Sequence, residues 1–463
     1  MTQFDVVVIG AGPGGYSAAI RCAQSGLKTA IVERASWGGV TANSGAVPLK
    51  SLLRGAGLAH LLAHGSQAYG ITGETTIDYG VAHARSRAAS DHMVKGIHYL
   101  MRKHKITEYQ GRAVFKDAET VAVSFDTGVV ERLAFDHCVI ATGAVPRFPP
   151  GVKPGPLVQA YDELMERKTW PESVVVAGGG AAGVEFAYLM SGYGAKVTVV
   201  EMADRLLPGA DPEVSAQLAR SFRELGIDLL VAHEVKGVIE GDDAVRVYVT
   251  PSRGGEHFMV EAGLLAVCTG VEPRTEGLDL AVTGVALTPE GAIGVDEAMR
   301  TNVPGLYAVG DVTGQVMLAG AAMAQGAAAA EAIAGRAGAG LDYAMMPRTV
   351  NCEPQVASFG HTEAAARALG LDVAVSKFPF AAGAGGAGEG GGFVKLVVDT
   401  RHREILGVHM IGQGVGELLG ELSLAQLWDL TADELARNFH AHPSLSEAIR
   451  EVSAAASGWL ATY

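Results

Sequence analysis

The chain has 463 residues, more than one hydrophobic core can organise, so two to four domains are expected. A formal net charge of −14, with no basic segment, argues against a nucleic-acid or anionic-membrane surface. The most apolar long run, residues 319–339, carries three polar or charged residues and is a poor membrane span. The four cysteines show neither a CxxC motif nor metal-ligand spacing. We therefore expect a metal-free cytoplasmic protein, without a signal peptide because a strand begins almost at once.

The first predicted element is an apolar strand over residues 4–9, followed by a glycine-rich turn and an Ala-rich helix. The turn contains Gly10, Gly12 and Gly15, and a second apolar strand ends on Glu33. This order is typical of a βαβ unit with parallel strands. The glycines let a diphosphate approach the backbone at the helix N-terminus, and the carboxylate binds ribose hydroxyls. The segment therefore predicts a dinucleotide site.

A second segment repeats the design from residue 173 onward. Its turn contains Gly178, Gly180 and Gly183, and its second strand ends on Glu201 at the same interval from the first glycine (33 − 10 = 201 − 178 = 23). One such turn is weak evidence, but two copies in the same context predict two dinucleotide sites. The alternative is a pair of glycine turns in a doubly wound sheet with no ligand.

The downstream segment Gly310–Asp311 suits an extended FAD that spans more than one βαβ unit. Asp311 would bind a flavin-side hydroxyl, and the helix that starts near Leu318 and Ala319 would stabilise reduced flavin with its positive end. The alternative for Asp311 is an ordinary strand-end turn or a helix N-cap.

The residues around Glu201 predict the second cofactor. A 2′-phosphate at this position would meet Glu201 and Asp204, and Arg205 is the only nearby cation. The sequence therefore favours NADH over NADPH.

Together these residues resemble the flavoprotein disulfide reductases, and among them the dihydrolipoamide dehydrogenases most closely, over essentially the whole chain. The resemblance implies an α/β fold with two Rossmann-like dinucleotide-binding domains, for FAD and NAD, and an α+β C-terminal dimerisation domain. The implied order is an FAD-binding domain over 1–147, an NAD-binding domain over 148–273, a return to the FAD domain over 274–342 and an interface domain over 343–463. The segments that carry the resemblance are 10–15, 141–143, 178–185, 301–311, 377–380 and 440–447.

The resemblance also implies further site residues and a homodimer. Ala113, Thr142, Gly143 and Gly270 are expected to contact the cofactors. In the family, the C-terminal His-Pro motif of one subunit completes the active site of the other, so His442 is expected to act across a two-fold axis.

The family's redox motif keeps its frame over residues 38–50, but Thr41 and Ala46 stand at its two cysteine positions. Thiol–disulfide exchange requires a thiolate, and neither Thr nor Ala can form one. The resemblance therefore predicts that the chain does not reduce disulfides by the family mechanism.

Two other pairs match functional positions of the family. Lys50 and Glu185 match an ion pair between flavin and nicotinamide, and the alternative is a structural salt bridge at a domain junction. His442 and Glu447 match the acid/base histidine and its carboxylate, and the alternative is a motif that only packs at the dimer interface. His440 is expected to be structural.

The sequence thus predicts an FAD-dependent NADH oxidoreductase in which reduced FAD passes electrons to a non-disulfide small-molecule acceptor. Candidate acceptors are a quinone, a second nicotinamide or an activated small molecule, with His442 and Glu447 as a proton relay. The alternatives are a flavin oxidase or monooxygenase that uses the space beside Ala46 for oxygen, and a non-catalytic FAD-bound dimer that docks on a partner complex.

Overall fold

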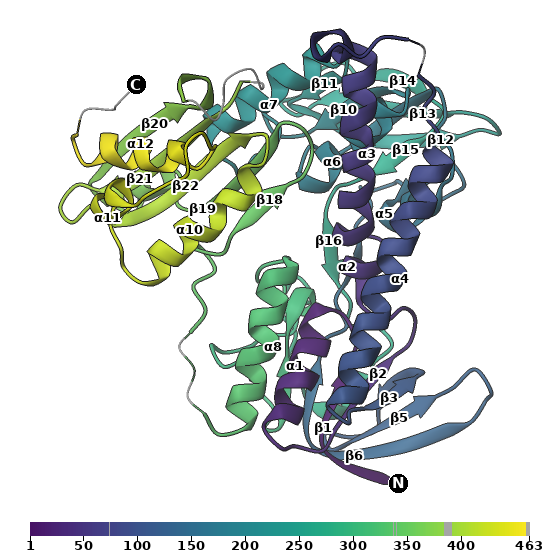
Figure 1. Cartoon of the computed structure of the whole chain (residues 1–463). Helices are drawn as coiled ribbons and strands as arrows, with labels where there is room; N and C mark the ends of the chain where they lie inside the picture. The colour runs from purple at the N-terminus through teal and green to yellow at the C-terminus, as the bar shows by residue number, and fades with distance from the viewer. Residues whose placement is uncertain (74, 337, 339, 384–390, 460–463) are drawn as a thin grey trace.

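The computed structural model describes residues 1–73, 75–336, 338, 340–383 and 391–459, and Figure 1 shows their arrangement. The first sheet has the strand order β3-β2-β1-β6-β5-β4, with β17 beside β6. Its centre is parallel and fully buried, which explains the continuous apolar run at residues 6–9. The strands are β1 (Thr2–Ile9), β2 (Thr29–Glu33), β3 (Thr107–Gln110), β4 (Arg112–Phe115), β5 (Thr120–Ser124), β6 (Val130–Ile140) and β17 (Leu306–Ala308).

Helices from distant parts of the chain cover this sheet. Helices α1 (Pro13–Gln24) and α8 (Ala319–Ile333) lie side by side (Figure 1). A Cβ on Gly326 would lie 2.4 Å from the Gly14 carbonyl oxygen, so only glycine permits this close approach. The other helices of this part are α2 (Gly39–Asn43), α3 (Ala46–His64) and α4 (Tyr79–Lys103).

The second sheet repeats the central topology of the first, with the order β11-β10-β9-β15-β8. All its strand pairs are parallel, and a three-stranded antiparallel sheet packs beside it. Both predicted βαβ units are therefore present. The elements are β8 (Val158–Ala160), α5 (Tyr161–Glu166), β9 (Ser173–Ala177), α6 (Ala181–Gly192), β10 (Lys196–Glu201), α7 (Pro212–Glu224), β11 (Asp228–Val231), β12 (His233–Glu240), β13 (Val245–Pro251), β14 (Phe258–Ala262) and β15 (Leu265–Val267).

The two chain segments that connect these units pair with each other in a small separate sheet. Strand β7 (Ala144–Pro146) pairs antiparallel with β16 (Val271–Pro273), so the outgoing and returning chains run side by side. Pro146 is tolerated in β7 because it lies at the end of the strand, where no backbone donor is needed.

The C-terminal part is an antiparallel sheet with the order β18-β19-β22-β21-β20, flanked by helices (Figure 1). It has its own apolar core, built from the inward faces of the sheet and of α10 and α12. The elements are β18 (Arg348–Val350), β19 (Gln355–Gly360), α9 (Glu363–Ala368), β20 (Val373–Pro379), β21 (Phe393–Asp399), β22 (Ile405–Gly412), α10 (Val415–Leu427), α11 (Ala432–Arg437) and α12 (Glu447–Ala456).

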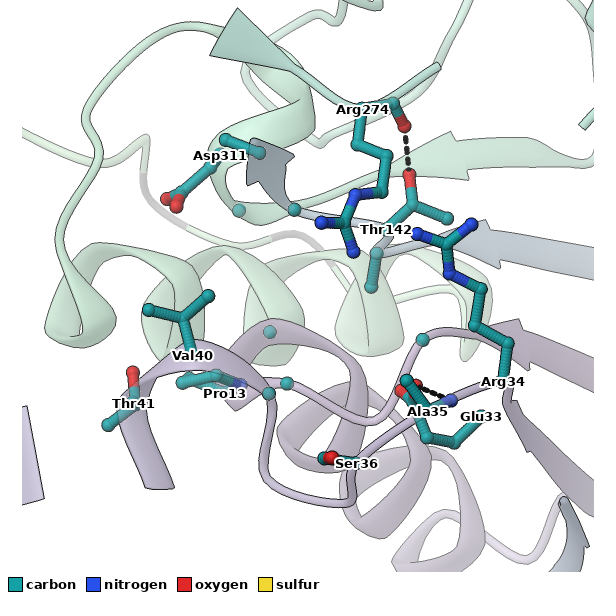
Figure 2. A pocket seen from close by; sticks show the side chains of 18 of the residues that line it. Pro13, Glu33, Arg34, Ala35, Ser36, Val40, Thr41, Thr142, Arg274 and Asp311 are labelled. Atoms are coloured by element: carbon teal, nitrogen blue, oxygen red, sulfur yellow. Dashed lines mark hydrogen bonds between the residues drawn. The ribbon is translucent and has the colours of Figure 1, made fainter. Parts of the chain in front are cut away.

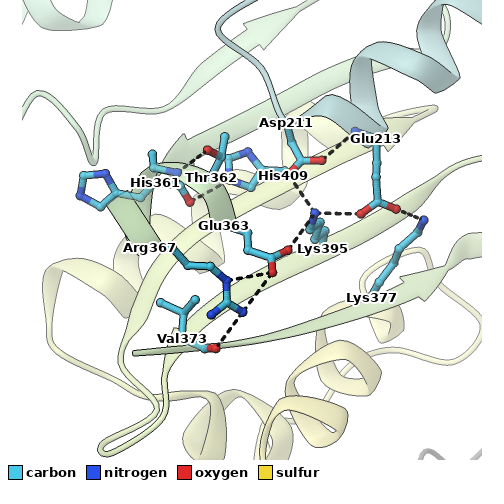
Figure 3. A network of polar contacts seen from close by, with 11 residues as sticks. Asp211, Glu213, His361, Thr362, Glu363, Arg367, Val373, Lys377, Lys395 and His409 are labelled. Carbon is cyan, nitrogen blue, oxygen red and sulfur yellow. Dashed lines mark hydrogen bonds and ion pairs between the residues drawn. The ribbon is translucent and has the colours of Figure 1, made fainter. Parts of the chain in front are cut away.

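A polar network joins the C-terminal sheet to α7 (Figure 3). The Lys395 ammonium, on β21, lies 2.9 Å from Asp211 Oδ2 and 2.8 Å from Glu213 Oε1. Asp211 also caps α7, because its Oδ1 accepts from the Glu213 N–H at 2.9 Å. Lys377, on β20, binds the other oxygen of Glu213 from a more exposed position. The network therefore fixes the C-terminal sheet against the second unit.

Loss of the buried lysine should destabilise the protein far more than loss of its exposed neighbour. Lys395→Ala leaves the buried Asp211 carboxylate without its cation, at a cost of about 3–5 kcal/mol. Lys377→Ala is the matched control and should cost less than about 1 kcal/mol, since its side chain is 43% exposed. Thermal unfolding of both variants measures the difference, and equal shifts in Tm would contradict a stabilising role for the buried pair.

Candidate functional site

A first cavity of about 690 Å³ opens at the carboxyl ends of β1, β2 and β6, where parallel α/β sheets bind ligands. The residues that line it come from several segments between residues 9 and 322. Of the predicted site residues, its walls include Gly10, Gly12, Glu33, Thr41, Ala46, Ala113, Thr142, Gly143, Gly310, Asp311, Leu318 and Ala319.

Each glycine of the first turn meets a different constraint. Gly10 has a φ of +103°, and a Cβ there would lie 2.3 Å from the Ala141 carbonyl oxygen. A Cβ on Gly15 would lie 1.8 Å from the Gly10 oxygen, so this residue brings α1 against β1 rather than lining the cavity. A Cβ on Gly12 would have nothing nearer than 4.0 Å and would project into open space. The backbone at Gly12 is therefore accessible to a diphosphate, as the FAD site requires.

Glu33 is held in place for a ribose. Its Oε2 accepts from the Ala11 N–H and its Oε1 from the Ala35 N–H, both at 2.8 Å, and Figure 2 shows the second of these bonds. Each carboxylate oxygen has a second lone pair for a ribose hydroxyl. The site thus fits the adenosine half of a dinucleotide.

A second cavity, of about 840 Å³, reproduces these features in the second unit. Gly178 has a φ of +104°, a Cβ on Gly183 would lie 1.8 Å from the Gly178 oxygen, and a Cβ on Gly180 would meet nothing within 4 Å. Glu201 accepts from the Gly179 N–H at 2.6 Å and the Ala203 N–H at 2.7 Å. Gly178, Gly180, Glu201 and Gly270 line this cavity, and Gly183 lies behind it.

The downstream segment closes the first cavity on its far side. Helix α8 begins at Ala319, directly after Leu318, and both residues lie on the cavity wall. The buried Gln325 side chain accepts from the Gly310 N–H at 2.7 Å and so fixes the turn that carries Asp311. Burial raises the pKa of Asp311. Asp311 is thus a half-buried acceptor at the cavity, as an FAD hydroxyl would need.

Thr41, on α2, and Ala46, at the start of α3, stand on the wall of the first cavity (Figure 2 labels Thr41). None of the four cysteines is among the described residues that line it. Cys268 lies in the second cavity, and burial raises the pKa of its thiol to about 12. A thiolate at Cys268 is therefore strongly disfavoured at neutral pH.

The prediction that Lys50 and Glu185 form an ion pair is wrong. Within the described residues, the Lys50 ammonium pairs with Glu417 at 3.9 Å, and both side chains are largely exposed. Glu185 Oε1 instead accepts from the Asn351 N–H at 2.6 Å and from its side-chain amide at 3.1 Å. Burial raises the pKa of Glu185, and the two Asn351 donors oppose that rise. Asn351 thus replaces Lys50 as the partner, and neither Lys50 nor Glu185 lines either cavity.

The His442–Glu447 pair is formed. His442 Nδ1 lies 2.8 Å from Glu447 Oε1, and Glu447 Oε2 accepts from the Ser444 N–H at 3.0 Å. Glu447 is buried, whereas the His442 side chain is 64% exposed. His442 lines neither cavity of its own chain. The carboxylate therefore orients an imidazole that faces outward.

The C-terminal part that carries His442 also exposes large apolar side chains. Phe439, three residues before His442, is 97% exposed, and Leu427 and Trp428, at the end of α10, are each 70% exposed. His440 is different, because its Nε2 lies 3.0 Å from Glu421 Oε1 and its side chain is nearly buried. This arrangement agrees with the structural role expected for His440.

Two groups of residues that line the first cavity were not predicted from the sequence motifs. Asp162, on α5, accepts from the Ser44 hydroxyl at 3.0 Å, and burial raises the pKa of its carboxyl. Three arginines, Arg34, Arg112 and Arg274, also line the first cavity. Arg34 and Arg112 directly follow or precede predicted site residues, so their positions in the chain carried a signal. Asp162 lies in a segment without any motif, and only the fold brings it to the cavity.

Comparison with known proteins identifies the family. The model of the pyridine nucleotide-disulphide oxidoreductase family matches residues 4–326, and that of its dimerisation domain matches residues 346–453. The chain belongs to this family. It is 49% identical over 454 residues to a dihydrolipoyl dehydrogenase of Mycobacterium tuberculosis, with 97% of each chain covered. It is 45% identical over 469 residues to that of Corynebacterium glutamicum, with 100% of each covered.

Solved structures of the family share the fold. LpdA from Mycobacterium tuberculosis is similar with a TM-score of 0.88 and 26% identity, covering 98% of this chain and 99% of that one. The HOCl-induced flavoprotein disulfide reductase RclA from Escherichia coli has a TM-score of 0.85 and 25% identity, covering 97% and 99%.

Membership of the family confirms the predicted fold class and the FAD- and NAD-binding oxidoreductase character of the chain. The C-terminal sheet and its helices are the dimerisation domain. No helix in the described part of the chain is both long and apolar enough to cross a membrane.

Proposed function

We propose that this chain is an FAD-dependent NADH oxidoreductase of the dihydrolipoyl dehydrogenase type that serves a non-disulfide acceptor. One observation carries the proposal: both nucleotide cradles are intact, while Thr41 and Ala46 stand on the cavity wall at the positions that match the redox cysteines. Bound FAD supplies hydride acceptance and electron release. Without a thiolate on this wall, the chain provides no disulfide to carry those electrons further.

The residues of the two cavities have distinct roles in this proposal. Gly12 and Glu33 hold the diphosphate and ribose of FAD, and Asp311 accepts a hydroxyl nearer the flavin. Gly180 and Glu201 hold NADH in the same manner. The backbone at Leu318 and Ala319 presents the positive end of α8 to the flavin.

The domain division supports this assignment of roles. We propose FAD-binding segments over 1–147 and 274–342, an NAD-binding domain over 148–273 and an interface domain over 343–463. Strand β17 returns to the first sheet beside β6, which supports the second FAD-binding segment.

We further propose that the protein is an obligate homodimer in which His442 donates a proton in the partner's active site. The outward imidazole and the exposed Phe439, Leu427 and Trp428 support this arrangement, because large apolar side chains cluster at interfaces. Glu447 engages Nδ1, so the proton exchanged with a substrate is that of Nε2.

Three classes of acceptor remain compatible with this site: a quinone, a second nicotinamide and an activated small molecule. The small side chain of Ala46 favours a second candidate, an oxidase or monooxygenase, because it leaves room for oxygen on the cavity wall. Oxygen consumption driven by NADH distinguishes this candidate.

The first prediction concerns the missing disulfide. Anaerobic NADH should bleach the flavin absorbance, and oxidised lipoamide should not restore it, because neither Thr41 nor Ala46 can form a thiolate. The Thr41→Cys/Ala46→Cys double variant is the positive control, and each single variant is its matched control. Lipoamide turnover by the wild type at the rate of the double variant would contradict the proposal. A flavin that NADH fails to bleach would instead favour a non-catalytic FAD-bound dimer.

The second prediction concerns the nucleotide. NADH should reduce the flavin faster than NADPH at equal concentration, because the Glu201 carboxylate repels a 2′-phosphate. Arg205 offers no compensation, since its Nε lies 3.1 Å from Asp204 Oδ1 and it is outside the second cavity. Glu201→Ala should narrow the difference between the rates of flavin reduction by NADH and by NADPH. Faster reduction of the wild type by NADPH would disprove this role for Glu201.

The third prediction concerns the proton relay. His442→Ala should leave flavin reduction by NADH unchanged and slow reoxidation by a proton-taking acceptor by ~10²–10⁴-fold. Glu447→Gln should slow reoxidation less, because the Glu447 carboxylate only orients the imidazole. Stopped-flow absorbance measures the two half-reactions separately, with a one-electron dye as an acceptor that needs no proton.

His402→Ala is a matched control, because that histidine is exposed on the same domain and pairs with Asp399 instead of Glu447. Equal reoxidation rates in the wild type and His442→Ala, with the dimer intact, would make the pair purely structural. A monomer with full activity would contradict the shared site.

A further inference from the structure

The three arginines of the first cavity have no partner in the described part of the chain. No hydrogen bond or ion pair there involves the side chain of Arg34, Arg112 or Arg274, and the Nε atom of Arg274 is buried without a hydrogen bond. Glu33 and Asp162 interact electrostatically with Arg34 and Arg274, respectively, but neither carboxylate forms an ion pair with them, although carboxylates outnumber basic groups in a protein whose net charge is −14. A cluster of unpaired guanidinium groups in a cavity points to an anionic ligand.

Two of these arginines lie together. Figure 2 shows the guanidinium groups of Arg34 and Arg274 beside Thr142, across the cavity from Pro13 at the start of α1. Partial desolvation and then the charge of Arg274 lower the pKa of Arg34, and the neighbouring Glu33 opposes part of this effect. The two like charges repel each other unless an anion lies between them.

The chain fixes both arginines by their backbone. Arg34 directly follows Glu33, whose carboxylate is bound to the N–H groups of Ala11 and Ala35. The backbone carbonyl oxygen of Arg274 accepts from the Thr142 hydroxyl at 2.7 Å, and its backbone N–H donates to the Gly143 oxygen at 2.9 Å. The backbone at both arginines is thus fixed at the site before any ligand binds.

The opposite wall has no cation of its own. The first turn presents Gly12 and the N-terminus of α1, which offer backbone N–H groups and a partial positive charge. A dinucleotide diphosphate carries a negative charge on each phosphate, and these two phosphates would lie between Gly12 and the arginines. The charge of Arg112 also lowers the pKa of Arg34, by less than that of Arg274, but the Arg112 guanidinium lies against Gly277, 2.4 Å from where a Cβ would be.

We infer that Arg34 and Arg274 form a clamp over the FAD diphosphate, on the side opposite the α1 N-terminus. This inference rests on the proposed FAD site and adds two binding residues that lie outside both glycine motifs. Because the contacts are ionic and the cavity is open, salt should weaken them and FAD retention should depend on ionic strength.

Release of FAD from the purified holoenzyme tests the clamp. The measured quantity is the rise in FAD fluorescence after dilution, over a series of KCl concentrations. Arg34→Gln and Arg274→Gln should each speed release by about tenfold, as expected for the loss of one charge-assisted hydrogen bond. The double variant should also respond less steeply to KCl, and Arg274→Lys should retain part of the effect because it keeps the charge.

Arg102→Gln is the matched control, because Arg102 is an exposed arginine of α4 outside both cavities. It removes the same charge and should leave release unchanged, while thermal unfolding verifies that every variant is folded. Equal release rates and equal KCl slopes in the wild type and the double variant would overturn the clamp.

Two further outcomes separate this inference from the proposed function. A wild-type protein that purifies without a flavin spectrum would overturn the FAD site itself. Inorganic phosphate is the probe for a free anion. If the double variant loses thermal stabilisation by phosphate but releases FAD at the wild-type rate, the arginines serve a separate anion and their assignment to FAD is overturned.

Discussion

The close approach of a helix to the strand before it is the constraint on which both nucleotide sites depend. At Gly15 and at Gly183, a Cβ would lie 1.8 Å from the oxygen of the first glycine of the turn. Any side chain at these positions would push the helix away and move its N-terminus from the ligand. The same contact brings the acidic residue of the next strand within hydrogen-bonding distance of the turn, so the ribose site and the diphosphate site form together.

The two turns are nearly the same, so they do not by themselves select FAD or NAD. The difference comes from what surrounds each turn. The first cavity is extended by Asp311 and the N-terminus of α8, which belong to a segment that returns from far downstream. The second cavity has no such extension in the described residues and is closed by the segments at residues 147–150 and 268–272. This convergence of segments is the reason for our proposal that the first cavity binds the longer ligand, FAD.

Local patterns in the sequence predicted both βαβ units well, because each unit is contiguous and its last glycine, Gly15 or Gly183, meets the first glycine of the same turn. The resemblance to the family predicted the pair of His442 and Glu447, which are five positions apart. Long-range pairs were less predictable. Glu185 binds Asn351 and Lys50 lies near Glu417, and both partners belong to the C-terminal part of the chain. Asp162 and Arg274 reach the cavity only through tertiary structure, since neither stands in a repeated pattern.

The origin of each wall sets an order for assembly during synthesis. The second cavity is built entirely from residues 147–272, so it can close once that stretch has left the ribosome. The first cavity needs Gly10 and Ala322 together, and α1 packs closely on α8 because Gly326 has no side chain to hold the two helices apart. The N-terminal unit therefore stays incomplete, with the α8-facing side of α1 uncovered, until α8 has been translated. With the proposed assignment of the cofactors, FAD would bind only after residue 322 has been synthesised, whereas the site for the second nucleotide would be complete at residue 272.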